Sequence, residues 1–363
     1  MPAEQSHKLW LHALRKRAWF LNRLSDGWMS GLLAWSLVFG VLQPGICEDR
    51  ITYRSANGEE TRVRVGSLSQ YVDGEIQFQV REGGLLKIPS ARVVQLEFES
   101  GEAWKKGLEF WNEGNWDEAF DLLVKAYRDE DRDWAKYEIQ SVILRCAYAL
   151  EKYEIACDVF LQMMEDDPGT RHFHWIPLSW QRGDDDPTLI RQAERWMQSS
   201  NSLERLLGAS WLLTTAKQSQ AIEVLKGVAE SGKQPFADMA RTQSWRLRVP
   251  RADRDLVNLW RQAIAEMPIE LRSGPNWLIA QAASRLESHD LAAINYLKVA
   301  VDENAHEALR AEALLGAARQ LQDEHPRESA ETLKELKNRF SQSNAWQLGQ
   351  QLGKYSVCWR QCA

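Results

Sequence analysis

Hydrophobic and polar residues alternate in short runs between residues 50 and 99. Every second position is apolar over 76–80 and again over 94–98, which places the apolar side chains on one face of a strand. Three turn sequences separate the runs: Asn57-Gly58, Asp73-Gly74 and Gly83-Gly84. The pattern therefore predicts about five short strands, which form a small β module over 48–99.

The period of the hydrophobic pattern changes at Gly101. From there apolar residues recur at spacings of three and four, which predicts one helix after another to residue 345. Helix ends are expected near Gly114, Pro168, Asp186-Pro187, Gly232, Pro268, Gly274-Pro275 and Pro326. Asp186 is expected to cap a helix that starts at Pro187. The predicted fold class is mainly α, with a C-terminal tail over 346–363.

The predicted helices repeat on a longer scale. A small or apolar residue marks each repeat: Ala119, Ala156, Ala193, Ala221, Leu256, Ala293 and Ala330. Successive marks lie 37, 37, 28, 35, 37 and 37 residues apart. Small residues let the two helices of a unit pack closely, and larger ones fill the space to the next unit: Phe160, Leu225, Trp260 and Leu297. One helix pair cannot bury its apolar face alone, so such units stack.

The segment 114–126, GNWDEAFDLLVKA, resembles the tetratricopeptide repeat. The matching residues are Gly107 and Phe110 on the first helix, Ala119 and Ala126 on the second, and Ala156, Phe160 and Pro168 in the next unit. The resemblance covers about 100–345 and implies an α-solenoid of antiparallel helix pairs. Pro177 lies inside the expected first helix of the Ala193 unit, so that unit is expected to be distorted. The preceding strands resemble small SH3-like or Sm-like barrels.

The repeat resemblance also implies a binding face. Tetratricopeptide proteins typically bind extended peptides or partner proteins along the concave face, which the first helix of each unit lines. Carried over to this chain, that face comprises Trp104, Leu108, Trp111, Arg145, Tyr148, Arg241, Trp245, Arg248, Arg285 and Arg319. Arginines interleaved with aromatic rings suit an acidic peptide or a C-terminal carboxylate. Alternatively, Trp104, Leu108 and Trp111 form the surface on which the β module docks.

The N-terminal segment predicts export. Five basic residues (Lys8, Arg15, Lys16, Arg17 and Arg23) precede an apolar run over 28–42, and small residues and a polar start follow. This order is typical of a signal peptide over 1–47, with cleavage after Cys47. The run is shorter than the roughly 20 residues of a spanning helix, but an uncleaved anchor remains the alternative. Either form places the protein in the periplasm or cell envelope.

The cysteines fit export. Cleavage would leave four of the five cysteines. Cys358 and Cys362 are spaced to bridge in an oxidising compartment, whereas Cys146 and Cys157 are expected to be buried thiols on neighbouring helices.

Composition and motifs narrow the function. The net charge of −6 argues against a general nucleic-acid binder. No phosphate-binding loop, nucleophile elbow or HExxH motif occurs, so no catalytic, cofactor-binding or metal site is predicted. His172 and His174, two positions apart, make a weak metal pair. The predicted function is a non-catalytic scaffold that binds a protein or peptide.

Three alternatives remain open at this stage. The 17 Trp residues fit either a large helical core or sugar-stacking platforms of an envelope polysaccharide-binding module. Exposed Trp would favour the polysaccharide. A hydrolase-type site between barrel and solenoid would require ionisable groups that converge there. Self-association would require an apolar patch on the outer face of the helices.

Overall fold

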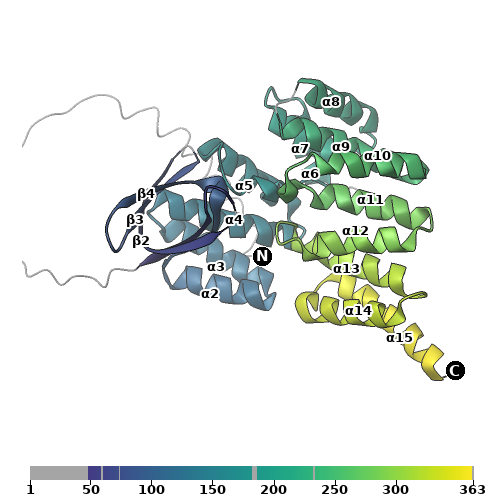
Figure 1. The fold of residues 1–363 in the computed structure, drawn as a ribbon. Helices are drawn as coiled ribbons and strands as arrows, with labels where there is room; N and C mark the ends of the chain where they lie inside the picture. Colours follow the sequence, from purple (N-terminus) through teal and green to yellow (C-terminus); the bar gives the residue numbers. More distant parts are fainter. Residues whose placement is uncertain (1–47, 59, 73, 182–185, 232–233, 362–363) are drawn as a thin grey trace, which may run out of the picture. The chain divides into compact units, whose positions relative to one another are not determined.

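A computed structural model describes residues 48–58, 60–72, 74–181, 186–231 and 234–361. From Cys47 onward the chain forms one compact unit. The described residues are mainly helical, with a small antiparallel sheet near the N-terminal side (Figure 1). The fold class predicted from the hydrophobic pattern is confirmed at this level. The predicted signal segment and Cys47 lie outside the described residues.

The sheet has five strands: β1 (Asp49–Arg54), β2 (Thr61–Val72), β3 (Glu75–Val80), β4 (Leu85–Pro89) and β5 (Val93–Glu97). All pairings are antiparallel, and the strand order is β4-β3-β2-β1-β5. A short 3-10 helix, η2 (Ser90–Arg92), precedes β5. The predicted turns join the first four strands, and Gly58, Gly74 and Gly83 adopt positive φ angles of 76°, 74° and 100° there.

One face of the sheet forms a core with the helices. Ile51, Ile76 and Phe78 are fully buried, and Trp134 and Ala135 from the first turn of a helix pack in the same cluster. Ile76 and Phe78 are apolar positions of the predicted alternation over 76–80, which correctly separates inward from outward side chains there. The alternation over 94–98 is wrong at its start, because Val94 is exposed and Val93 is buried, next to a register shift in the pairing of β1 with β5. The β module is therefore attached to the helical part through a shared apolar core.

The described residues contain fourteen α-helices. They are α2 (Glu102–Glu113), α3 (Trp116–Asp129), α4 (Asp133–Ala149), α5 (Tyr153–Asp166), α6 (Pro187–Met197), α7 (Ser202–Leu212), α8 (Gln218–Ser231), α9 (Phe236–Arg248), α10 (Arg254–Ala265), α11 (Ser273–Arg285), α12 (His289–Val301), α13 (Glu307–Leu321), α14 (Pro326–Phe340) and α15 (Asn344–Gln361). Short 3-10 helices lie at η3 (Phe173–Trp175), η4 (Val249–Arg251) and η5 (Ile269–Leu271). Almost every helix packs against the next one in sequence.

Helix ends lie at glycine, proline and capping residues that the sequence predicts. Gly114 ends α2 with a φ of 79°. The Asp186 side chain accepts a bond from the backbone N–H of Thr188 at 2.8 Å, and Pro187 is the first residue of α6, as predicted. The predicted tail over 346–363 is wrong in part, because α15 continues to Gln361.

The repeat marks fall on α3, α5, α6, α8, α10, α12 and α14, which is every second helix except for the consecutive pair α5 and α6. Five of the marks are buried: Ala119, Ala156, Ala193, Ala221 and Ala293. The last mark is wrong by one position, because Ala330 is exposed and its neighbour Ser329 is buried. Leu256 is half-buried, and the adjacent Val257 takes the inner position.

The mark residues and their partners form the contacts between helices. The expected packing residues Phe160, Leu225 and Trp260 are buried, whereas Leu297 is only half-buried. A Cβ atom at Gly107 would lie 3.0 Å from the Leu123 side chain, so this glycine allows α2 and α3 to approach closely.

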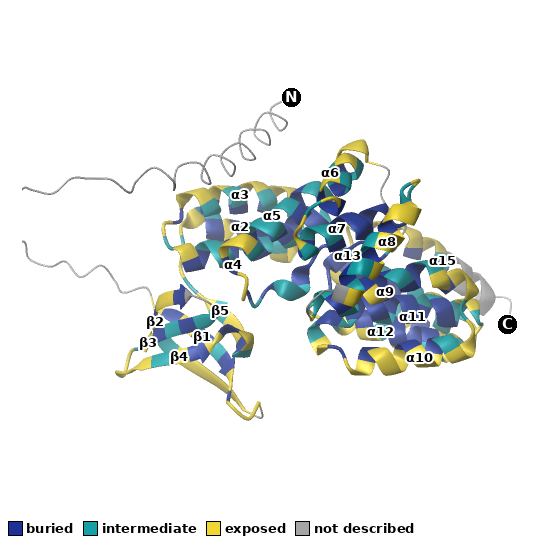
Figure 2. Cartoon of the chain, turned by 90° about the horizontal axis from the view of Figure 1, so that it is seen from above, coloured by how far each residue is buried: buried dark blue, intermediate teal, exposed yellow. Residues whose placement is uncertain are grey.

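Burial differs between the two sets of helices. Helices α4, α7, α9, α11 and α13 are buried on most sides, whereas α3, α10 and α14 each expose one face. Figure 2 shows this contrast between α11, mostly dark blue, and α10, largely yellow. We refer to α4, α7, α9, α11 and α13 as the inner helices. None of the helices in the described part is long and apolar enough to cross a membrane.

Candidate functional site

The first helix expected in the Ala193 unit is absent. In its place stand η3 and residues 176–181, which have no regular secondary structure. Pro177 has no backbone N–H to donate, which fits an extended segment better than a helix interior. The side chains of Ile176, Leu178 and Trp180 are all buried. The described residues around Pro177 therefore form no helix, and they bring an extended stretch of chain into the interior.

Side chains of the inner helices bind the backbone of this stretch. The bonds run from Tyr148 Oη to Leu178 O (3.2 Å), from Trp211 Nε1 to Pro177 O (3.0 Å), from His306 Nε2 to Ile176 O (3.5 Å), from Ser179 N to Ser210 Oγ (2.9 Å), and from Arg246 to Gln181 O. These residues come from α4, α7 and α9 and from the start of α13. Trp180 packs on α11, where a Cβ atom at Gly274 would lie 2.0 Å from its ring. Residues 176–181 therefore lie against the inner helices of the same chain.

The inner helices α4 and α13 meet beside this segment. Arg145 forms an ion pair with Glu307. Its guanidinium lies 4.8 Å from the ring centre of Trp111 and 4.3 Å from that of Trp175. The pair joins residues 162 positions apart in the chain, so it connects α4 directly with α13.

The ring stack next to this pair is uncharged. The rings of Tyr148 and His306 stack at 3.7 Å, with an angle of 10° between their planes. Burial lowers the pKa of His306 to about 3 and raises that of Tyr148 well above its usual value, so both rings are neutral near pH 7. The guanidinium of Arg246 loses solvation in the same interior, which lowers its pKa to about 10 and leaves it charged.

A buried carboxylate holds the start of the same loop. Glu138 on α4 accepts a bond from Arg171 and lies 3.1 Å from Nε2 of His172. Burial alone would raise the pKa of Glu138, but Arg171 and His172 together hold it at about 2. His172 is therefore engaged with this carboxylate, whereas Nδ1 of His174 lies 3.1 Å from the backbone oxygen of Arg171.

The structure separates the ten predicted binding residues into groups. Three of them, Trp111, Arg145 and Tyr148, come together at the α4–α13 contact just described. Their side chains bind other parts of the same chain. Around these three residues, the face that the repeat resemblance implies is thus occupied by residues 176–181 and by the Arg145–Glu307 pair.

Two of the predicted aromatic residues belong to the core. Trp104 stacks on Phe98 at 5.1 Å, at the junction with the β module, as the docking alternative expected. Trp245 stacks on Trp260 at 5.0 Å. Leu108 is half-buried on α2. Trp104 and Trp245 are therefore buried, and Leu108 is only partly exposed.

The remaining predicted residues are four exposed arginines. Arg241 pairs with Asp238 on its own helix. Arg248, Arg285 and Arg319 lie in the last turns of α9, α11 and α13. We call these last three the arginine edge.

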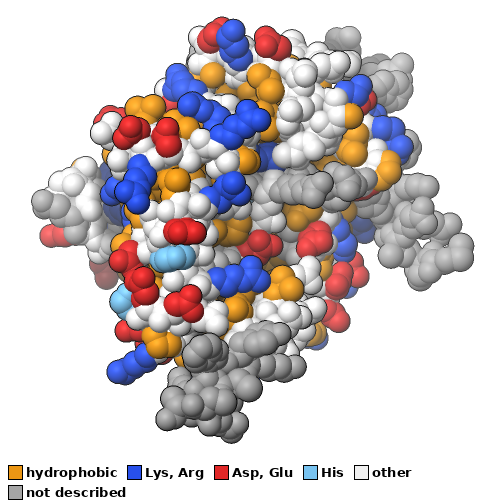
Figure 3. Space-filling model, turned by 90° about the vertical axis from the view of Figure 1, so that its right-hand side faces the viewer, with side chains coloured by type: hydrophobic (Ala, Val, Ile, Leu, Met, Phe, Trp, Pro, Cys, Tyr) orange, Lys and Arg blue, Asp and Glu red, His pale blue; other side chains and the backbone are white. Residues whose placement is uncertain are grey.

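Two hydrogen bonds show that the members of the arginine edge are neighbours. Arg285 donates to Pro250 O at 3.1 Å, two residues beyond Arg248. Gln320, next to Arg319, donates to Ser284 Oγ at 2.9 Å, next to Arg285. Seen from the right of Figure 1, Lys and Arg side chains gather over the upper part of the surface, and Asp, Glu and His over the lower part (Figure 3).

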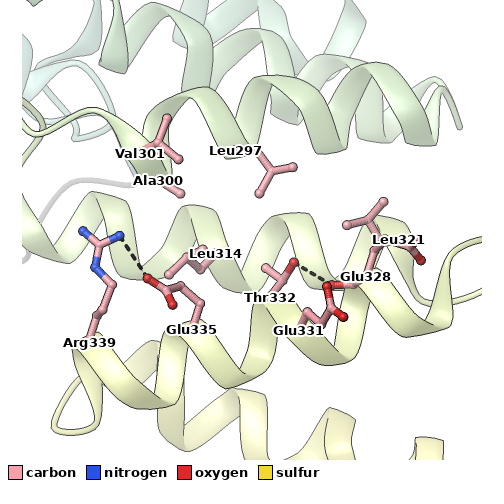
Figure 4. A pocket seen from close by; sticks show the side chains of 10 residues that line it. All are labelled: Leu297, Ala300, Val301, Leu314, Leu321, Glu328, Glu331, Thr332, Glu335 and Arg339. Atoms are coloured by element: carbon pink, nitrogen blue, oxygen red, sulfur yellow. Dashed lines mark hydrogen bonds and ion pairs between the residues drawn. The ribbon is translucent and has the colours of Figure 1, made fainter.

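A groove of about 450 Å³ lies between α12, α13 and α14. Its apolar residues are Leu297, Ala300, Val301, Leu314 and Leu321, and its polar residues are Glu328, Glu331, Thr332, Glu335 and Arg339. In Figure 4 the apolar side chains of α12 lie on one side of the groove and the acidic side chains of α14 on the other. The spacing of hydrophobic residues in the sequence does not predict this groove, because it depends on how three helices pack.

One group of side chains in the described part could hold a metal ion: Asp290, Glu324 and His325. All three are exposed, and His325 Nε2 already lies 3.6 Å from Asp290 Oδ1 as an ion pair. Exposed acidic groups of this kind are common without a metal, so we assign none to them.

The Trp residues bear on the polysaccharide alternative. In the described part nine Trp side chains are buried, three are half-buried and none is exposed. The junction with the β module bears on the hydrolase alternative, because Phe98, Trp104 and Trp134 fill it with stacked and edge-on rings. Neither alternative gains support from these positions.

Sequence reasoning missed the residues that bind the internal segment, notably Ser210, Arg246 and His306. The available signal was a polar residue among the apolar residues of a predicted buried helix. The spacing of hydrophobic residues does not show which part of the chain such a residue contacts. Comparisons with protein-family models and with curated proteins find no match to this chain. Its function therefore has to be inferred from its own surfaces.

Proposed function

We propose that this protein is a non-catalytic adaptor that acts outside the cytoplasm and binds an acidic segment of a partner protein along the arginine edge. The observation that carries the proposal is the alignment of Arg248, Arg285 and Arg319 at the ends of three neighbouring inner helices. We further propose that the helices form tetratricopeptide-like units in a solenoid, which is supported by the five buried marks and by their recurrence on every second helix apart from α5 and α6.

The chemistry of the edge suits carboxylates. Each guanidinium presents a planar set of donors that matches a carboxylate in two parallel hydrogen bonds. Arg248 and Arg319 form no hydrogen bond or close ion pair within the described residues, so their donors are available. Arg285 uses one donor on Pro250 O and keeps others.

The rest of the predicted face is less suitable for a partner. Displacing residues 176–181 would expose Ile176, Leu178 and Trp180, at about 1.5–3 kcal/mol for each large apolar side chain. Charge attraction at a surface offers roughly 1 kcal/mol per pair, so an acidic peptide cannot drive that exchange. The partner is therefore expected at the exposed edge and not in the interior.

The binding test compares two charge-reversal variants of the full chain. In Arg248→Glu/Arg319→Glu the edge loses two cations, and in Arg191→Glu/Arg195→Glu two exposed arginines of α6 are reversed as a matched control. Binding of a fluorescein-labelled, Glu-rich peptide with a free carboxyl terminus is measured by anisotropy. We expect the edge variant to bind at least about tenfold more weakly and the control to bind like the parent protein.

Two results would contradict the proposal. If both variants bind the acidic peptide like the parent protein, the edge is not the site. If both lose binding equally, the attraction reflects overall charge and not a defined edge.

Export is tested separately, with residues 1–60 fused to a reporter enzyme that is active only outside the cytoplasm. The basic flank and the apolar run over 28–42 lead us to expect activity. An inactive fusion that is nevertheless expressed would contradict the proposed location.

A further inference from the structure

The groove between α12, α13 and α14 has two walls of different chemistry. On α12, Ile294, Leu297 and Val301 are spaced at i, i+3 and i+7 and therefore share one face of the helix. Ile294 is 52% exposed and Val301 is 68% exposed, and Leu297 is half-buried in the groove. An apolar stripe with this spacing normally packs against another element, but no described part of the chain covers it.

The facing wall is acidic. Glu328, Glu331 and Glu335 on α14 repeat the same spacing of i, i+3 and i+7 and all line the groove. Arg327 pairs with Glu331 at 3.3 Å, and Arg339 pairs with Glu335 at 3.4 Å.

These two ion pairs are exposed, so each contributes little to stability. A cation of a partner can therefore easily take the place of the arginine in each pair. The Glu328 carboxylate has no ion-pair partner in the part of the chain that the structure describes. The wall thus keeps an acidic surface that another molecule could neutralise.

The floor of the groove comes from α13 and α12. Leu314, Leu321 and Ala300 lie between the two walls (Figure 4). Both walls extend over eight residues of helix, which corresponds to about 10 Å or two turns. A ligand that matches the groove therefore needs an apolar face of about this length, with positive charge along one side.

We infer that this groove binds a basic amphipathic helix of a partner protein. Its apolar side chains at i, i+3 and i+7 would lie against Ile294, Leu297 and Val301, and its Lys or Arg residues would face the three glutamates of α14. The charge of the groove is opposite to that of the arginine edge, so a basic helix and an acidic segment bind at different places. Two surfaces of opposite charge would allow this adaptor to hold two partners at once.

The test uses the full chain and a defined probe. The probe is a labelled peptide of about 14 residues, with Leu at i, i+3, i+4 and i+7 and Lys at most other positions. Its two controls are a scrambled peptide of the same composition and a version with Glu in place of Lys. We expect the amphipathic basic peptide to bind, and both controls to bind at least about tenfold more weakly.

Matched variants locate the site. Val301→Asp places a charge on the apolar wall, and Leu259→Asp makes the same change at a 58% exposed position on α10. We expect about a tenfold loss of peptide binding for Val301→Asp and less than about a twofold change for Leu259→Asp. Both side chains are exposed, so neither variant should fail to fold.

A second pair of variants tests the acidic wall. Glu328→Lys/Glu331→Lys reverses two groove carboxylates, and Glu223→Lys/Glu230→Lys reverses two exposed ones on α8. We expect only the first to weaken binding, by roughly fivefold or more at low salt and less at high salt.

Three results would overturn the inference. Equal binding of the scrambled peptide would show charge attraction alone, and equal binding to Val301→Asp would place the peptide elsewhere. If the peptide does not bind and sedimentation shows a dimer that Val301→Asp dissociates, the groove contacts a second copy of the chain. None of these results affects binding of the acidic peptide at the arginine edge, so the two proposals fail independently.

Discussion

The ion pair between Arg145 and Glu307 offers the most direct test of how the helices are held together. Replacing Arg145 with Met keeps the aliphatic stem between Trp111 and Trp175 but removes the charge. The Glu307 side chain is 8% exposed, so its carboxylate would then be buried without a cation. Breaking a buried pair in this way typically costs about 3–5 kcal/mol.

Two features set the expected magnitude within this range. Glu307 lies in the first turn of α13, where the helix N-terminus partly stabilises a negative charge. The Arg145 side chain is 23% exposed, so water screens the pair in part. We therefore expect about 3 kcal/mol for Arg145→Met and somewhat less for Glu307→Gln, which leaves the more exposed charge behind.

The assay is thermal unfolding, followed by circular dichroism and by Trp fluorescence. For a folded unit of this size, 3 kcal/mol corresponds to a decrease in Tm of about 5 °C. The double variant should lose less than the sum of the single variants, with a coupling energy of at least about 1 kcal/mol.

If Arg145→Met leaves Tm unchanged and the coupling is absent, the pair does not hold α4 against α13. Arg145 would then be available to a ligand, as the repeat resemblance implies.

Three further predictions concern the interior. Gly274→Ala should reduce the free energy of unfolding by about 1–3 kcal/mol, because the new Cβ would lie 2.0 Å from the ring of Trp180. Gly227→Ala meets only the tip of an arginine side chain at 3.1 Å, so it should be neutral or slightly stabilising, and thermal melting distinguishes the two variants. The lowered pKa of His306 means that its protonation favours the unfolded chain. The free energy of unfolding should therefore fall as pH decreases from 6.5 towards 3, by about 1.4 kcal/mol per pH unit. Urea titrations at several pH values should show a smaller slope for His306→Gln. Burial raises the pKa of the Cys157 thiol, so mass spectrometry should find it unmodified by iodoacetamide in the native protein and alkylated in urea; rapid alkylation of the native protein would contradict its burial.

Local patterns predicted many of the strands and helices of this protein, but not the irregular stretch over 176–181 or the helix α15. The period of two over 76–80 and the glycine turns predicted the strands, because side chains alternate across a sheet regardless of what packs on it. The spacing of three and four residues predicted the helices, and Asp186-Pro187 predicted where α6 begins. These features depend on neighbours within a few residues, which the sequence displays directly.

The binding surface depended on contacts between distant residues. Arg145 and Glu307 are 162 positions apart, and no local pattern shows that they form a pair. The ten residues taken from the repeat resemblance were assigned to one face because regular units would place them there. Residues 176–181 change that outcome, because this extended segment lies against the inner helices and forms hydrogen bonds with their polar side chains.

The sequence by itself thus determined the strands, most helix ends and the periodic marks, since each follows from the steric and hydrogen-bonding needs of a short stretch of chain. The tertiary structure decided which polar residues remain available to a partner. Arg145 and Arg248 have the same side chain and the same ability to bind a carboxylate. Packing pairs the first with Glu307 and half-buries it, and leaves the second exposed, because burial is a property of the assembled helices and not of the residue.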